Sequence, residues 1–248
     1  MTERALGPFD LFKVFLRLLI FQALLNARGL QNLSFAGAIS PVADKIEGDD
    51  GNAMLLRHLR YFNSNPNFAS LIIGGVLKLE VERANGKPVS DKDIEYFKTS
   101  LAGPLAAMGD MLFLENLRPL ALTCACIFAI HNSLTGLLAV FMLYNLVVVS
   151  CRLWGVCFGY SKGWELVDVF TGTGYQRILS VAQGIGATAG GALLAAILYS
   201  FPENGRWVLF PAGAVAVIAL YLLRKDVPAS WFAIILFPTS ALFAVILG

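Results

Sequence analysis

The chain has 248 residues, of which 57% are hydrophobic and 15% charged, and its mean hydropathy is +0.67. This composition excludes an ordinary soluble globular domain, and a formal net charge of +2 is too small to indicate binding to nucleic acid. Residues 1–116 carry 12 Lys/Arg and 13 Asp/Glu, whereas residues 117–248 carry 7 and 4. We therefore expect an N-terminal amphipathic and re-entrant region with aqueous loops over 1–116, and a transmembrane helical region over 117–248.

The first predicted element is an amphipathic helix over residues 8–27. Asp10, Lys13 and Arg17 share one face at three- and four-residue spacing, while Gln22 and Asn26 fall on roughly the opposite face. The charged face is typical of a helix that lies in the head groups of a membrane. The two amides either belong to that interface or face protein or a cavity. The same charges, with no small-residue cleavage site after them, argue against a cleavable signal peptide.

Two polar stretches follow, and we expect both to be aqueous. Residues 44–60 contain a turn signal at 48–51 and indicate a surface loop and helix, with His58 in solvent. Residues 80–98 contain a turn at 85–88, after which Ser90 is expected to cap a helix. Asp93, three residues later, would complete a capping box.

Two short apolar segments lie beside these stretches, at 68–77 and around 103–110. Each is introduced or broken by Pro, Gly or side-chain amides, and each is shorter than the roughly 20 residues that a spanning helix needs. Such segments are tolerated at membrane depth where protein or water satisfies their backbone, and they often build solute sites in transporters. We therefore predict short re-entrant segments and a transporter for a polar solute.

Three side chains at the edges of these segments are candidates for that solute pathway. The amides of Asn63 and Asn65 both donate and accept hydrogen bonds, which suits sugar hydroxyls; alternatively, Asn65-Pro66 makes a turn that caps the next helix. Asp110 lies between two apolar runs, where a carboxylate is expensive and indicates function, with Arg118 or a hydroxylated substrate as its partner. Otherwise Asp110 caps the helix that follows it.

The chain becomes strongly apolar after Arg118-Pro119. The predicted membrane helices lie near 119–131, 134–153, 176–200, 207–223 and 230–247, with a long loop over 154–175. Arg206 alone falls in a loop on one side, whereas five basic residues fall on the other: Arg152, Lys162, Arg177, Arg224 and Lys225. An excess of Lys and Arg marks the cytoplasmic side of a membrane. The pattern predicts about five crossings, with the N-terminus in the cytoplasm and the C-terminus outside.

The sequence offers little that would support catalysis or metal binding. Neither of the two histidines, His58 and His131, has a carboxylate or cysteine at metal-ligand spacing. The four cysteines form no Cys-x-x-Cys pair, so a zinc or dithiol site is unsupported. We predict no metal, no cofactor and no catalytic residue on this chain.

Several tracts in order resemble the IID membrane component of the mannose/fructose/sorbose family of bacterial sugar phosphotransferase systems. They include an amide-rich first helix, an Arg-His-Leu tract at 57–59 leading to Phe62-Asn63 and Pro66, and Glu80 followed by Arg-Ala-Asn-Gly at 83–86. The remaining residues that match this family's signatures are Gly103, Pro104, Gly109, Asp110, Phe113, Arg118, Pro119, Gly159, Tyr160, Lys162 and Gly163.

The resemblance implies an all-α, multi-pass protein of the bacterial cytoplasmic membrane. It also implies assembly with a sister membrane component, IIC, in a trimer of IIC–IID pairs that carries a hexose across the lipid. In the family a phosphoryl group passes through the carriers IIA and IIB to the entering sugar, so a IID chain carries no phosphorylated residue. The pathway residues would be Asn63, Asn65, Asp110, Gln22 and Asn26.

Two alternatives stay open. The third glycine of the family's Gly-Pro-Leu-Ala-Gly signature is Ala107 here, and Met111 and Leu114 replace the proline and tryptophan that follow Gly-Asp. These changes favour a degenerate subunit that regulates or scaffolds a phosphotransferase complex. An unrelated membrane enzyme is the other alternative, although no His, Ser or Cys is a good candidate for its chemistry.

Overall fold

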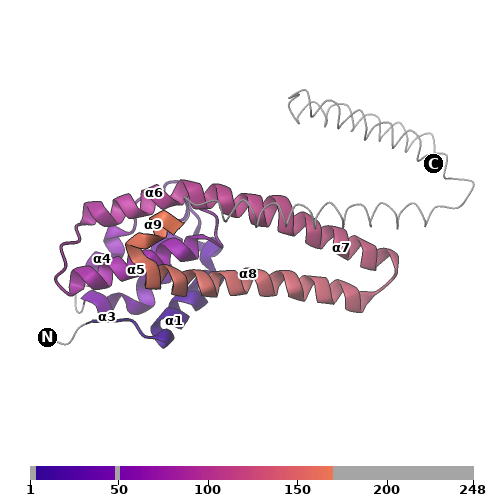
Figure 1. Ribbon diagram of the computed structural model, residues 1–248, viewed down its shortest axis with the longest axis horizontal. Coiled ribbons are helices and arrows are strands. Elements are labelled where there is room, and N and C mark those ends of the chain that lie inside the picture. The colour runs from indigo at the N-terminus through magenta and orange to yellow at the C-terminus, as the bar shows by residue number, and fades with distance from the viewer. Residues whose placement is uncertain (1–3, 48–50, 170–248) are drawn as a thin grey trace, which may run out of the picture. The chain divides into compact units, whose positions relative to one another are not determined.

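The computed structural model describes residues 4–47 and 51–169, all within the first of two compact units, residues 1–193. No strand occurs in these ranges, where the chain forms helices joined by short loops (Figure 1). The helices are α1 (Pro8–Leu19), α2 (Asn32–Ile39), α3 (Ala43–Glu47), α4 (Gly51–Arg57), α5 (Ala69–Ala84), α6 (Asp91–Gly109), α7 (Arg118–Ile130), α8 (Leu134–Lys162) and α9 (Leu166–Val169).

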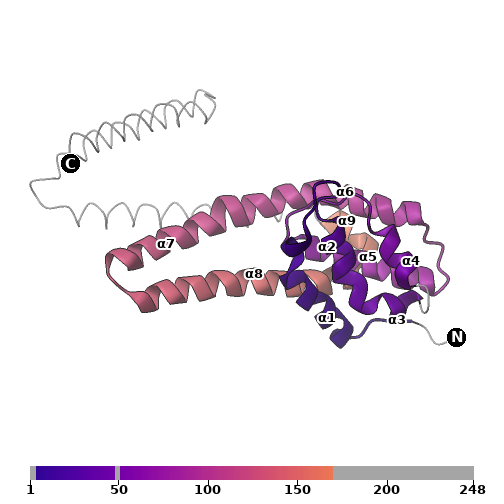
Figure 2. The same cartoon turned by 180° about the vertical axis from the view of Figure 1, so that it is seen from behind.

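The helices α1 to α6 and the end of α8 form a body, from which α7 and the start of α8 project as a helical hairpin (Figures 1 and 2). The α5 helix lies at the centre of the body and packs most extensively against α8. Its apolar residues were predicted to form a short re-entrant segment. They are instead almost entirely buried by protein, and the helix continues past Leu77 to Ala84.

Close packing of α5 on α8 depends on small residues in both helices. A Cβ atom at Gly159 would lie 2.1 Å from the carbonyl oxygen of Leu71, and one at Gly74 would lie 2.2 Å from the carbonyl oxygen of Val156. Gly155 meets the Ser70 side chain in the same way. Small residues at four-residue spacing let helix backbones approach one another, as in many membrane-helix pairs.

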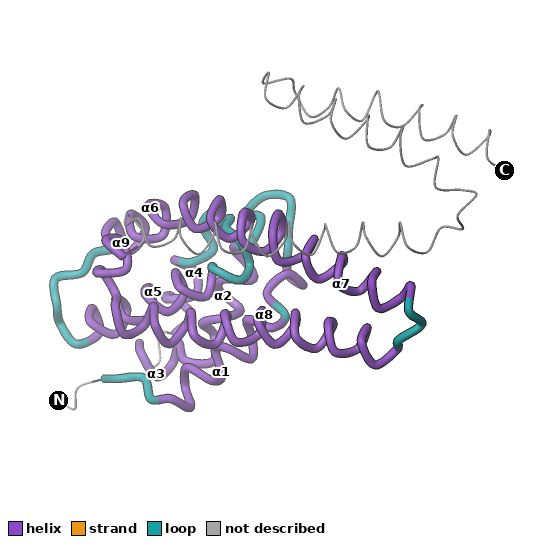
Figure 3. Tube along the Cα trace, turned by 45° about the vertical axis from the view of Figure 1, so that its right-hand side comes forward, coloured by secondary structure: helices purple, strands orange, loops and turns teal. Residues whose placement is uncertain are grey.

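The short apolar segment predicted around 103–110 is not interrupted in the structure. Residues Asp91–Ile130 form one continuous helix of 40 residues, in which α6 and α7 are joined by a π-helical segment, η4 (Asp110–Leu117) (Figure 3). Pro104 and Pro119 are exposed on this helix. Gly103 and Pro104 therefore do not end a short segment, and the boundary predicted at 116/117 lies inside the helix.

Two helical stretches, Asp91–Ile130 and Leu134–Asp168, are long and apolar enough to cross a membrane. The second begins at Leu134, where a helix was predicted, whereas the first begins at Asp91 and not near 119. The second stays helical through Lys162, so 154–162 is not a loop. Large apolar side chains such as Leu138, Phe141 and Met142 are exposed along the hairpin. The three later predicted crossings lie outside the described residues.

Candidate functional site

Residues 62–67 form an extended segment between α4 and α5 that crosses the body. Its buried polar residues, Ser64, Asn65 and Asn67, each make hydrogen bonds to a different part of the fold. Ser64 donates from its hydroxyl to the carbonyl oxygen of Ala102 on α6, at 3.0 Å. Its backbone amide donates to Gln31 Oε1 at 2.9 Å, and Gln31 Nε2 donates to the Ser64 carbonyl oxygen at 2.8 Å. A buried polar group needs such partners, and this segment obtains them from side chains and loops.

Asn65 and Asp110 lie together, although they are 45 residues apart in the sequence. Asn65 Nδ2 donates to Asp110 Oδ1 at 2.9 Å, and Asn65 Oδ1 accepts from the backbone amide of Asn67 at 3.0 Å. Gly109 makes this approach possible, because a Cβ atom there would lie 2.4 Å from the Asn65 side chain. Asp110 thus does not cap a new helix, and Asn65, not Arg118, is its partner among the described residues.

Ser64, Asn65 and Asn67, with the groups they bind, form a layer of polar contacts, which we call the polar layer. Asn67 extends this layer to α8 and α1. Arg152 Nε donates to Asn67 Oδ1 at 2.9 Å, and its guanidinium also donates to the carbonyl oxygen of Leu18 at 2.7 Å, at the end of α1. The sequence pattern placed Arg152 only in the count of cytoplasmic charges. Its position as a lone cation in the apolar run of α8 was the signal that could have identified it.

The other predicted pathway residues lie apart from this layer. Asn63 and Gln22 are exposed, and Gln22 lies in the short 3₁₀ helix η1 (Phe21–Leu24) that follows α1. Asn26 holds a local turn, since its Oδ1 accepts from the amide of Gly29 at 2.8 Å and its Nδ2 donates to Asn32 Oδ1 at 2.7 Å. The structure thus joins only Asn65 and Asp110 by a direct bond.

Most residues of the family signature in α8 have a packing role. Tyr160 accepts a hydrogen bond from the backbone amide of Leu6 at 3.0 Å, and Lys162 Nζ lies 3.0 Å from Glu165. Gly163 ends α8 with φ of +53°, a conformation that favours glycine. In contrast, Gly103 has open space around it, and Arg118 is exposed.

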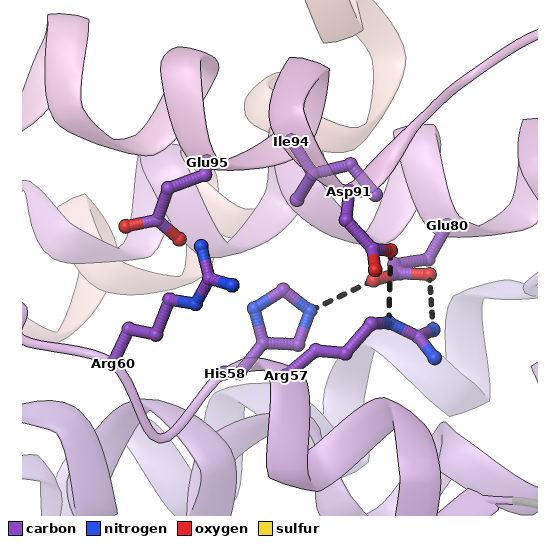
Figure 4. Close-up of a pocket in the computed structure, with 7 residues that line it drawn as sticks. All are labelled: Arg57, His58, Arg60, Glu80, Asp91, Ile94 and Glu95. Carbon is purple, nitrogen blue, oxygen red and sulfur yellow. Dashed lines mark hydrogen bonds and ion pairs between the residues drawn. The ribbon is translucent and has the colours of Figure 1, made fainter.

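A second polar cluster, drawn in Figure 4, surrounds Glu80 near the C-terminal end of α5 and was not predicted. Its centre is Glu80, which is 1% exposed. Glu80 Oε1 lies 2.9 Å from His58 Nε2, and Arg57 donates to Glu80 Oε2 at 3.0 Å and to Glu47 at 2.8 Å. His58 is also 1% exposed and stacks on Phe35, so the expectation of a solvated histidine was wrong. Lys98, likewise 1% exposed, lies over the Phe35 ring.

The ionisation of this cluster follows from burial and from Arg57. Burial lowers the pKa of His58, with Lys98 and Arg57 acting in the same direction and Glu80 opposing them. Burial alone would raise the pKa of Glu80, but its bonds and charge interactions with His58 and Arg57 outweigh burial and lower it. We conclude that a neutral His58 donates to an ionised Glu80, whose charge Arg57 balances.

The cavity beside the cluster is small. It measures about 20 Å³, room for roughly one water molecule. His58 Nδ1 is buried there without a hydrogen-bond partner, and Arg57 Nε makes only an ion-pair contact of 3.6 Å with Asp91 Oδ1. Within the described ranges no three His, Cys, Asp or Glu residues are grouped to hold a metal ion. The cluster ties α3, α4 and α5 together just ahead of the 62–67 segment and is a structural support for it.

The exposed apolar hairpin and the polar layer at its base define a helical membrane protein with polar groups held between its helices. Residues 6–201 match the family model of the PTS system mannose/fructose/sorbose family IID component. The chain belongs to this family of phosphotransferase-system IID components.

Individual relatives agree with that assignment. The mannose-specific EIID component of Escherichia coli strain K12 is 36% identical over 196 residues, which are 78% of this chain and 69% of that protein. The sorbose-specific EIID component of Lacticaseibacillus casei is 30% identical over 241 residues, 88% and 86% of the two chains. The fructose permease IID component of Bacillus subtilis strain 168 is 29% identical over 194 residues, 77% and 70%.

Solved structures are similar as well. A cryo-EM structure of the mannose transporter ManYZ in complex with microcin E492 contains a chain of 29% identity, with a TM-score of 0.63 over 98% of both chains. Another solved membrane protein is 30% identical, with a TM-score of 0.73 over 97% of both chains.

Proposed function

We propose that this chain is the IID subunit of a phosphoenolpyruvate-dependent permease for a hexose of the mannose, fructose or sorbose type. It pairs with a IIC component in the cytoplasmic membrane, in a trimer of such pairs, and the sugar is phosphorylated by IIB as it enters. The match of residues 6–201 to the IID family carries this proposal. The relatives named for mannose, sorbose and fructose transport support the substrate class.

The hairpin supports assembly with another membrane chain. Its large apolar side chains are exposed, and it projects beyond the body (Figure 1). Lipid and the IIC component together would cover it. We therefore expect the chain alone in detergent to aggregate, and co-expression with IIC to give a large complex.

In the proposed mechanism this chain positions the sugar pathway and transfers no phosphoryl group itself. The Asn65–Asp110 pair offers a carboxylate and amide at the base of the hairpin, groups that bind sugar hydroxyls. Asn63, Gln22 and Asn26 remain proposed contributors to the pathway. Phosphorylation on entry traps the sugar, because a doubly charged phosphate cannot recross lipid.

Uptake of labelled mannose, fructose and sorbose tests this function. Cells that lack their own IID component should take up and phosphorylate one of these sugars when they express the chain with its IIC, IIA and IIB partners. Asp110→Asn and Asn63→Ala should each reduce apparent affinity about tenfold to a hundredfold, the effect of losing ~1–3 kcal/mol of hydrogen bonding. Co-purification of each variant with IIC shows whether it folds. Unchanged uptake by both variants would mean that the two side chains do not contribute to the sugar pathway.

A scaffolding subunit is the second candidate, and the substitutions in the signature beside Asp110 favour it. Met111 follows Asp110 directly, and Ala107 and Leu114 are exposed on the same continuous helix. A chain that co-purifies with IIC and yet supports no uptake of any of the three sugars would identify this second function.

A further inference from the structure

Arg118 is an exposed cation within the longest helix described, Asp91–Ile130. It is the first residue of α7, and it is flanked by apolar residues toward the tip of the hairpin. Among the described residues it has no ion-pair partner. In this it differs from Arg152, whose guanidinium is satisfied by Asn67 and by the end of α1.

The length of the hairpin places Arg118 at membrane depth. Twelve residues separate it from the end of α7 at Ile130, which corresponds to about 18 Å at 1.5 Å per helical residue. A hairpin whose polar tip, His131 to Ser133, reaches one surface of a hydrocarbon core of about 30 Å therefore holds Arg118 near the midplane. A charge there requires a partner.

Among the described residues, no carboxylate is paired with Arg118. Glu115 is exposed one turn away and forms no ion pair among the described residues, and Asp110 is bonded to Asn65. Residues 170–248 contain only two acidic residues, Glu203 and Asp226, and both fall outside the apolar runs at 176–200, 207–223 and 230–247. Glu115 makes no bond to Arg118, which leaves the guanidinium available to an acidic group of another molecule.

A groove between α7 and α8 lies beside Arg118 and shows what form that molecule takes. It has a volume of about 300 Å³ and is lined mainly by apolar side chains, with Arg118, Tyr144 and Asn145 among them. The small residues Ala121 and Ala125 form part of its floor. Apolar walls, small residues and a single cation fit a transmembrane helix that carries one acidic side chain.

We propose that this groove binds a transmembrane helix of another chain and that an Asp or Glu on that helix pairs with Arg118. The inference rests on the proposed function in one respect, since that function supplies IIC as the other chain. It adds the contact on the hairpin and the chemistry of the partner residue.

Co-purification with a tagged IIC component, together with a charge exchange, tests the contact. Arg118→Glu should reduce the recovered IIC at least tenfold, and Arg118→Lys should retain most of it. Arg28→Glu, an exposed arginine outside the hairpin, should have no effect. Each Asp and Glu in the membrane segments of IIC is then changed to Arg, and one of these variants should restore recovery with Arg118→Glu. If Arg118→Glu does not accumulate, Arg118→Gln gives the same comparison.

Other outcomes would overturn the proposal. Undiminished recovery with Arg118→Glu or Arg118→Gln would show that the cation is not needed at the interface. Recovery by the exchange Glu115→Arg with Arg118→Glu would mean an ion pair within this chain. Loss that no IIC variant restores would mean that Arg118 does not pair with an Asp or Glu in the membrane segments of IIC. Failure of the unmodified chain to co-purify with IIC would instead contradict the proposed function.

Discussion

Glu80 on α5 is a buried charge that links this helix to the end of α4 through Arg57 and His58. It is held by His58 and Arg57 inside the body, whereas Glu82, two residues later, pairs with Lys87 at the surface at 2.9 Å. Breaking a buried ion pair from one side typically costs ~3–5 kcal/mol, compared with ~0–1 kcal/mol for a surface pair. We expect Glu80→Gln to lower the thermal unfolding temperature of the purified complex strongly, and Glu82→Gln to leave it nearly unchanged. Equal effects would contradict the structural role of the cluster.

His58 should make the fold sensitive to mild acid. Its pKa in the folded state lies below the ordinary value of 6.5, so the unfolded chain binds the proton more readily. Stability should therefore fall as the pH drops below 6.5, by up to about 1.4 kcal/mol per pH unit. The pKa of Glu80 is lowered from 4.5, so its contribution is lost only at still lower pH.

The two histidines of the chain provide a matched comparison for this effect. Thermal unfolding measured at pH 7.5, 6.5 and 5.5 should depend less on pH in His58→Gln than in the unmodified protein. His131→Gln changes an exposed residue at the hairpin tip and should leave the pH dependence as it was. A pH dependence that His58→Gln leaves intact would assign the effect to other groups.

Local sequence patterns predicted which polar residues form contacts with near neighbours in the chain, but not which distant residues they contact. The spacing from Ser90 to Asp93 predicted a capping box, and the structure confirms it, because both bonds form within four residues. The contact of Asn65 with Asp110 spans 45 residues and depends on the missing side chain of Gly109. Similarly, His58 is polar in its local sequence but buried by Glu80, 22 residues away. Such pairings arise from tertiary packing, which no local window contains.

Helix packing between α5 and α8 should tolerate no added side chain at Gly159. A Cβ atom would meet the backbone of Leu71, which cannot rotate away as a side chain can. Gly159→Val should therefore open the helix pair and cost ~1–3 kcal/mol or more. Gly103→Ala, in open space on α6, should be neutral or stabilise by up to ~1 kcal/mol because alanine favours helix. Thermal unfolding of the two variants measures the contrast, and similar destabilisation by both would argue against the packing.

Proline was a misleading signal at the scale of elements. Pro104 predicted a break in a short apolar segment, and Pro119 predicted the start of a membrane helix, since proline removes a backbone donor from a helix interior. The helix nevertheless continues from Asp91 to Ile130, with both prolines exposed and the second placed at the end of the π-helical segment. The turn of the hairpin was predictable, because the polar tip at 131–133 separates two apolar runs. The length of α8 was not predictable. Its last turns, residues 154–162, contain polar side chains that suggested a loop, but the body buries or contacts them.

The orientation of the whole molecule in the membrane is still a prediction from charge. Cysteines introduced at Lys162 and Lys225 of a variant lacking the four native cysteines should resist an impermeant thiol reagent in intact cells, whereas one at Asn204 should react. Lys225 and Asn204 lie outside the described residues. The reverse labelling pattern would invert the proposed topology. Arg118→Cys in the same background should react weakly from either side, as expected for a position near the middle of the membrane.

The hydrogen bond from Arg152 to the Leu18 carbonyl joins residues 134 positions apart. It can form only after the ribosome has made the chain as far as Arg152. At 5–20 residues per second, a ribosome needs roughly 7–27 s to travel from the first of these codons to the second. During that interval the newborn N-terminal helix has neither Arg152 nor the hydroxyl of Tyr160, to which Leu6 later donates. Until α8 has been made, α1 can pack only on the earlier elements α2, η2 (Ser40–Val42) and α5, and the part of its surface that α8 later covers stays open.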